Sequence, residues 1–129
     1  IISVHNYINF NDKIVRKGAI SAHDGEKVII PLNMRDGSIV ARGKGNKNWN
    51  FSAPHGAGRI LSRSGAKKTV SLEEYKETMK NVYSSNVNKS TIDESPMAYK
   101  PSEEIIGLIN DTANIDFIMK PIYNFKGGE

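Results

Sequence analysis

The sequence contains no cysteine, few aromatic residues (8%) and no apolar run long enough to cross a membrane. Without cysteine the chain can form no disulfide, no thiolate zinc site and no cysteine nucleophile. A membrane span needs roughly 18 or more consecutive apolar residues. We therefore expect no membrane partner, and the cytoplasm is the expected compartment.

Positive charge and glycine are concentrated in the first half of the chain. Residues 1–68 contain 12 Lys and Arg against 4 Asp and Glu, a net charge of +8, whereas residues 69–129 contain 6 against 10, a net charge of −4. Eight of the 11 glycines lie at or before Gly65. Glycine mixed with Lys and Arg is typical of phosphate-binding loops, although a solvated basic face has the same composition.

Short apolar runs bounded by turn residues predict strands in the first half. Asp24-Gly25 and Asp36-Gly37 predict tight turns between them. Because the first run begins at residue 1, we expect a strand already in progress and a chain that is a fragment of a longer protein. The expected strands cover residues 1–4, 14–20, 27–31 and 38–42, with another near 49–52.

The second half has helical periodicity. Ser71 and Glu74 form a capping box ahead of apolar residues at helical spacing. A second helix is expected from Pro101 to near Asn114, followed by a closing strand over residues 115–125 that a proline interrupts. One modest core is possible at this length. The sequence therefore predicts an α+β fold, with a mixed sheet of short strands and two or three helices.

The stretch 50–64 is expected to pass from a strand through a glycine-rich turn into a short helix. Gly56 and Gly58 let the backbone approach a ligand, and the N–H groups of the helix start would bind phosphate. Arg59 and Arg63 would share one helix face and could clamp a second phosphate.

Two histidines are candidate site residues. His55 precedes the glycine turn, where a neutral imidazole could attack phosphorus, although hydrogen bonding to an anion or helix capping is commoner for such a motif. His5 follows an apolar run, where ligands often bind, yet taken alone it would usually be structural. One histidine cannot form a metal site, and His23 is expected in an exposed turn.

Basic residues next to an aromatic side chain form a second candidate surface. Arg42, Lys44 and Lys47 alternate with glycines and precede Trp49, which could stack on a base. The segment could face RNA, or it could be a charged, glycine-rich loop.

Four segments of the sequence stand out as motifs: APHGAGRILSR at 53–63, RKGA at 16–19, GKGN at 43–46 and PMAYK at 96–100. Together they resemble the RtcB family of RNA-splicing ligases. The resemblance runs from Val4 to Gly127 but matches only the carboxyl-terminal part of that family's proteins. It implies that residues 1–129 are the carboxyl-terminal segment of a larger catalytic domain, with 1–68 as its basic nucleotide and metal part and 69–129 as its helical part.

The resemblance implies a GTP- and Mn²⁺-dependent ligase that joins RNA 3′-phosphate or 2′,3′-cyclic phosphate ends to 5′-hydroxyl ends. His55 matches the histidine that attacks the α-phosphate of GTP and carries GMP. His5 matches a manganese ligand, and the family's other ligands, an aspartate, a cysteine and two histidines, lie in the missing amino-terminal half. Many members have Gly-Ser where this chain has Leu32-Asn33. The nucleotide-binding positions would be Asn6, Pro31, Leu32, Asn33, Met34, Ser38, His55, Gly56, Ala57, Gly58 and Lys126.

Two other functions remain open. A non-catalytic RNA- or phosphate-binding fragment without the upstream metal ligands would bind RNA in a salt-sensitive way and attach no nucleotide. A metal-dependent phosphohydrolase fits less well, because the sequence lacks the clustered ligands of a two-metal hydrolase.

Overall fold

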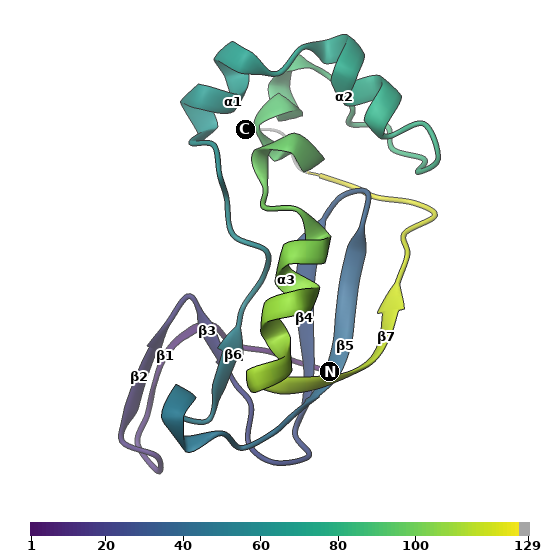
Figure 1. Cartoon of the computed structure of the whole chain (residues 1–129). Coiled ribbons are helices and arrows are strands. Elements are labelled where there is room, and N and C mark those ends of the chain that lie inside the picture. The colour runs from purple at the N-terminus through teal and green to yellow at the C-terminus, as the bar shows by residue number, and fades with distance from the viewer. Residues whose placement is uncertain (127–129) are drawn as a thin grey trace.

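Alternating side chains of β4 build one face of the largest sheet. In the computed structural model, which describes residues 1–126, β4 (Lys27–Asn33), β5 (Gly37–Gly43) and β7 (Ala113–Met119) form an antiparallel sheet in the order β4-β5-β7 (Figure 1). Every second residue of β4, from Val28 to Leu32, is buried. Gly127, the end of the motif match, lies outside the described residues.

Four shorter strands form two further antiparallel pairs. β1 (Asn6–Asn9) pairs with β2 (Ile14–Lys17), and β3 (Ala19–Ser21) pairs with β6 (Ser52–Pro54). Gly18, with a φ of +69°, separates β2 from β3 and divides the strand expected over 14–20. Within residues 1–126 the strands thus lie in three small antiparallel sheets, whereas the sequence suggested one mixed sheet.

Helix α3 covers the three-stranded sheet. α3 (Ser102–Leu108) lies alongside β4 (Figure 1), and its Ile105, followed by Ile109, packs against the sheet's buried side chains. Beyond Leu108 the chain continues in a 3-10 turn, η4 (Ile109–Asp111). The α+β class predicted from the sequence is therefore confirmed.

The remaining helices form a second layer with its own small core. α1 (Arg63–Thr69), α2 (Leu72–Thr78) and the 3-10 helices η2 (Lys89–Glu94) and η3 (Pro96–Ala98) lie beyond one end of the sheet (Figure 1). The Ser71–Glu74 capping box is present as predicted. Met34, directly after β4, is buried in this core, and its sulfur accepts a hydrogen bond from Tyr75 at 3.1 Å. None of the helices in the described range is long and apolar enough to cross a membrane.

Several expected boundaries were wrong. Residues 1–4 form no strand, and Ile2 is 91% exposed, because no described element packs over these apolar side chains. Asn114 already lies in β7, so the helix expected to end there stops earlier. β7 in turn ends at Met119, before the proline. A 3-10 turn, η1 (Lys47–Trp49), precedes β6. The turns at Gly25 and Gly37 are confirmed, with φ values of +72° and +86°.

Candidate nucleotide site

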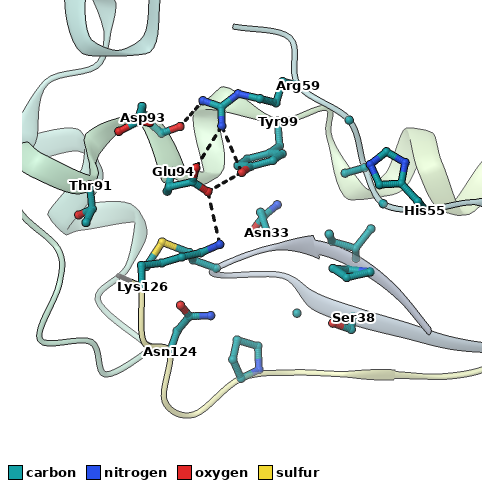
Figure 2. A pocket seen from close by; sticks show the side chains of 18 of the residues that line it. Asn33, Ser38, His55, Arg59, Thr91, Asp93, Glu94, Tyr99, Asn124 and Lys126 are labelled. Atoms are coloured by element: carbon teal, nitrogen blue, oxygen red, sulfur yellow. Dashed lines mark hydrogen bonds and ion pairs between the residues drawn. The ribbon is translucent and has the colours of Figure 1, made fainter. Parts of the chain in front are cut away.

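A cleft of about 960 Å³ opens where β4 and β5 meet the loop after His55 and the helical layer. Figure 2 shows His55 on one side of it and Glu94 with Lys126 on another. Small-molecule sites typically measure roughly 300–1,000 Å³, so the cleft has room for a nucleotide. Every predicted site residue except Asn6 lines it: His5, Pro31, Leu32, Asn33, Met34, Ser38, His55, Gly56, Ala57, Gly58 and Lys126.

The two candidate histidines come together at one side of the cleft. The rings of His5 and His55 stack with their centroids 5.0 Å apart and an angle of 29° between planes. Nδ1 of His55 lies 2.6 Å from the carbonyl oxygen of Gly18. A carbonyl only accepts hydrogen bonds, so Nδ1 carries the proton of the neutral ring and Nε2 keeps its lone pair. The contact therefore leaves Nε2 as the unprotonated nitrogen of the ring, with its lone pair free.

Asn6 acts on this arrangement from outside the cleft. The backbone N–H of Gly18 donates both to the carbonyl oxygen of His5, at 2.9 Å, and to Oδ1 of Asn6, at 3.0 Å. The Asn6 side chain therefore helps to hold the peptide segment whose carbonyl orients His55.

The glycine-rich loop lies against the end of β4. The N–H of Ala57 donates to the carbonyl oxygen of Pro31 at 3.1 Å, and a Cβ on Gly56 would lie 3.0 Å from that same oxygen. A side chain at position 56 would make this contact tight, so glycine favours the close approach of the two backbones. Gly58, with a φ of +72°, then turns the chain away from the sheet.

The short helix expected directly after the glycines is displaced. Arg59 instead forms a β-bridge with Tyr99, and α1 begins at Arg63 with Ser62 as its N-cap. The N–H groups of the glycine turn are consequently not those of a helix start. Arg59 and Arg63 do not share a helix face, and that expectation was wrong.

Both arginines instead face carboxylates of η2. Nη1 of Arg59 lies 3.4 Å from Glu94, while Nη1 of Arg63 lies 3.3 Å from Asp93 and 3.6 Å from Glu94. Arg59 also donates to the backbone carbonyl of Asp93. The acidic second half of the chain thus neutralises part of the charge of the basic first half. The two arginines that were predicted to clamp a second phosphate bind carboxylates instead.

Glu94 is the most connected acidic group of the cleft. It accepts a hydrogen bond from Tyr99 Oη at 2.7 Å and pairs with Nζ of Lys126 at 3.3 Å (Figure 2). Burial raises the pKa of Glu94, but the hydrogen bond from Tyr99 and the charges of Lys126 and Arg59 outweigh it and hold the pKa below its usual value. Burial, followed by the hydrogen bond to Glu94, raises the pKa of Tyr99 to about 12.

Three residues at the turn from β4 to β5 use their side chains in contacts within the protein. The side chains of Leu32 and Met34 are buried in the two cores. Asn33 uses its amide within the turn, donating to Asp36 at 2.8 Å and accepting from two backbone N–H groups. The hydrogen bond from Arg35, opposed by burial, lowers the pKa of Asp36 to about 2.

Sequence reasoning missed several lining residues. Asp93, Glu94 and Asn124 were not predicted, although the opposite net charges of the two halves were a signal for the acidic pair. The Oδ1 atom of Asn124 is buried and has no hydrogen-bond partner among residues 1–126. The remaining histidine, His23, lies outside the cleft with Nε2 2.9 Å from Asp12.

The candidate RNA-facing residues also lie outside the cleft. Arg42 pairs with Asp116 at 3.2 Å, and Lys44 donates to the carbonyl oxygen of Asn110. Trp49 is exposed. Arg42 thus pairs from β5 to the neighbouring strand β7, and Lys44, just after β5, contacts η4. The exposed indole leaves base stacking as a prediction.

The described residues do not fit a complete metal site. Among residues 1–126 no group of three or more His, Asp and Glu side chains could hold a metal ion. His5 and His55 are close, but two imidazoles are fewer ligands than a stable site requires.

Comparison with known proteins identifies relatives over nearly the whole chain. A family model described as tRNA-splicing ligase RtcB matches residues 2–127. The chain is 36% identical over 129 residues to the RNA-splicing ligase RtcB of Escherichia coli (strain K12), covering 95% of this chain and 31% of that protein. It is 40% identical over 86 residues to the tRNA-splicing ligase RtcB of Aeropyrum pernix, covering 63% and 18% respectively. The chain thus spans about a third or less of the length of these relatives.

Proposed function

Since the chain belongs to the RtcB family of tRNA-splicing ligases, we propose that it supplies the nucleotide-binding cleft and the nucleophile of a GTP- and Mn²⁺-dependent RNA ligase. The full activity would join RNA 3′-phosphate or 2′,3′-cyclic phosphate ends to 5′-hydroxyl ends. His55 is the catalytic residue of the proposal.

The contact between His55 and Gly18 is the observation that carries the proposal. With Nδ1–H held by the Gly18 carbonyl, the Nε2 lone pair is available to form a bond to the α-phosphorus of GTP. The bond from that phosphorus to the oxygen bridging to the β-phosphate breaks, and pyrophosphate leaves. His55 then carries GMP on Nε2, and the Gly18 carbonyl stabilises the Nδ1–H of the positively charged ring.

Transfer of GMP from His55 would activate the 3′-phosphate of the RNA for ligation. Oxide on an RNA 3′-phosphate is a poor leaving group. Transfer of GMP from His55 to that phosphate creates a phosphoanhydride whose leaving group is GMP. The 5′-hydroxyl of the second RNA can then attack the 3′-phosphorus, forming the phosphodiester and releasing GMP.

The cleft offers complementary groups along the length of a guanylate. Backbone groups near Pro31 and from Gly56 to Gly58 would lie along the phosphate and ribose, with the Ser38 hydroxyl nearby. Lys126, across the cleft from His55, would reach the base. Leu32, Asn33 and Met34 would contribute backbone contacts, and Asn6 would act through Gly18.

His5 is proposed as one ligand of manganese. When bound, Mn²⁺ would offset negative charge on the phosphate oxygens. Its other ligands would come from outside residues 1–126, because the described residues gather no group of three. No chemical step is therefore assigned to a metal held by this chain alone.

Covalent labelling tests the proposal. The chain would replace the matching segment of E. coli RtcB, and the chimera would be incubated with GTP and Mn²⁺ and analysed by mass spectrometry for an acid-labile GMP adduct. We expect an adduct on His55 that His55→Ala abolishes. His23→Ala, a change at a histidine outside the cleft, should leave it intact. Labelling that survives His55→Ala would contradict the assignment.

His5→Ala should weaken Mn²⁺ binding by the chimera, and an unchanged metal titration would remove His5 as a ligand.

A non-catalytic RNA- or phosphate-binding role is the second candidate. It is favoured by the lack of a three-ligand metal group among residues 1–126. Salt-sensitive RNA binding by the chain, together with no adduct in the chimera, would support this role over the ligase.

A further inference from the structure

Glu94 has two carboxylate oxygens that serve different sides of the nucleotide cleft. Oε1 faces the guanidinium groups of Arg59, at 3.4 Å, and Arg63, at 3.6 Å. Oε2 faces the phenol of Tyr99, at 2.7 Å, and the ammonium of Lys126, at 3.3 Å. Its side chain is only 16% exposed, so these interactions are less screened than surface ion pairs. Figure 2 shows Glu94 between Arg59, Tyr99 and Lys126.

The long side chain of Lys126 needs an ion-pair or hydrogen-bond partner to hold its ammonium group in one position. It lies beyond β7, and the preceding segment is anchored through Tyr83, whose N–H donates to Ile122 and whose carbonyl accepts from the N–H of Asn124. The rings of Tyr83 and Tyr123 stack, with centroids 5.6 Å apart. These contacts fix the backbone up to Asn124 but leave the four-carbon stem of Lys126 free to rotate. The ion pair with Glu94 sets the direction of that stem.

Arg59 connects the same carboxylate to the phosphate side. It follows Gly58 directly, forms the β-bridge with Tyr99, and stacks its guanidinium over the Tyr99 ring at 5.0 Å from the centroid. A shift of the Glu94 carboxylate would therefore displace both the end of the glycine loop and Lys126.

We infer that Glu94 is a positioning residue that fixes Lys126 at the base end of the cleft and holds Arg59 beside the glycine loop, and that it thereby sets the preference for guanine. The inference rests on the proposed function, in which His55 accepts GMP and Lys126 reaches the base.

The preference follows from the donor and acceptor groups of the purines. Guanine presents two acceptors, O6 and N7, whereas adenine presents the N7 acceptor beside an amino donor. A lysine ammonium has three donors and no acceptor, so it complements guanine and opposes the adenine amino group. This discrimination requires the ammonium to be held in place, because a mobile lysine can move away from the adenine amino group.

Base selectivity of His55 labelling provides the test. In the chimera with E. coli RtcB, kcat/KM for nucleotide attachment would be measured with GTP and with ATP. Glu94→Gln keeps the side-chain shape and removes the charge. We expect it to reduce the GTP-to-ATP ratio by about tenfold or more, the effect of losing a charge-assisted hydrogen bond. Lys126→Met should reduce the ratio similarly, and the double variant should be little worse than either single variant.

Glu104 offers a matched control. It pairs with Lys100 at the same 3.3 Å distance, but both side chains are exposed and neither lines the cleft. Glu104→Gln is the same chemical change, and the ratio should stay at the wild-type value. Should Glu94→Gln impair folding, Glu94→Asp keeps the charge on a shorter side chain and should also lower the ratio.

The outcomes separate the inference from the proposed function. Suppose that the wild-type chimera attaches GMP to His55. If Glu94→Gln then has the same GTP-to-ATP ratio as Glu104→Gln, or if the effects of the Glu94 and Lys126 variants add, the positioning role of Glu94 is wrong while the ligase proposal stands. If the wild-type chimera takes up no GMP under conditions in which E. coli RtcB does, the proposed function fails and the inference fails with it.

Discussion

The carbonyl oxygen of Gly18 accepts a hydrogen bond from Nδ1 of His55 at 2.6 Å, and the N–H of the same residue donates to the carbonyl oxygen of His5 at 2.9 Å. One glycine therefore connects two histidines that are far apart in the sequence and stacked in the structure.

The neutral side chain of His55 should have its proton on Nδ1. A carbonyl oxygen cannot donate, so only that tautomer satisfies the contact with Gly18. Long-range ¹H–¹⁵N correlation spectra of the chain at a pH where the ring is neutral would report a protonated Nδ1 and an unprotonated Nε2. A dominant Nε2–H form would contradict both the contact and the proposed nucleophilic atom.

Gly18→Ala should disturb His55 as well as the backbone. The φ of Gly18 is +69°, where a side chain costs roughly 1–2 kcal/mol, and relief of that strain would move the carbonyl that holds His55. Gly25, with a φ of +72° and nothing within 4 Å of an added Cβ, is the matched control. Urea unfolding should show a similar loss for both alanine variants, whereas only Gly18→Ala should alter the His55 ¹⁵N shifts. Equal shifts in the two variants would argue against a specific role for Gly18.

Local signals in the sequence predicted the features that depend on neighbouring residues. The Ser71–Glu74 capping box and the turn at Gly37 were confirmed because each is determined within a few residues. The motif around His55 predicted a site at the strand end, and the structure places its residues around one cleft. The roles of these residues remain predictions.

Features that depend on distant contacts could not be predicted in this way. The spacing of Arg59 and Arg63 suggested a shared helix face, but the partners that fix them, Asp93 and Glu94, lie in a layer folded over the glycine loop. The apolar residues 1–4 suggested a buried strand, yet burial depends on what packs over them. Hydrophobic pattern predicts which residues can be buried, and tertiary contacts decide which of them are.

Tyr99 should be among the last tyrosines to ionise. Burial and the hydrogen bond to Glu94 raise its pKa from 10 to about 12. A raised pKa means that the folded state favours the protonated phenol. This contribution to stability is therefore fully present below pH 10 and is lost as the pH rises through about 12. Absorbance titration of phenolate at 295 nm should show a late-titrating group that Tyr99→Phe removes. Loss of an early-titrating group in that variant would show that Tyr99 is not held by Glu94.

Gly37→Ala should be strongly destabilising, because its backbone neighbour leaves no room for a side chain. A Cβ at this position would overlap the carbonyl oxygen of Met119, in the adjacent strand β7, and the φ of +86° adds strain. Overpacking and a left-handed backbone together should lower the free energy of unfolding by about 3 kcal/mol. Gly107→Ala is the contrasting control: it lies in α3 with open space around it, and alanine there should stabilise the helix by about 0.5–1 kcal/mol. Denaturant titrations with unchanged slopes would measure both effects. Wild-type stability in Gly37→Ala would show that β5 and β7 are not paired at this end, and the cleft wall that Gly37 and Met119 share would then have to be placed differently.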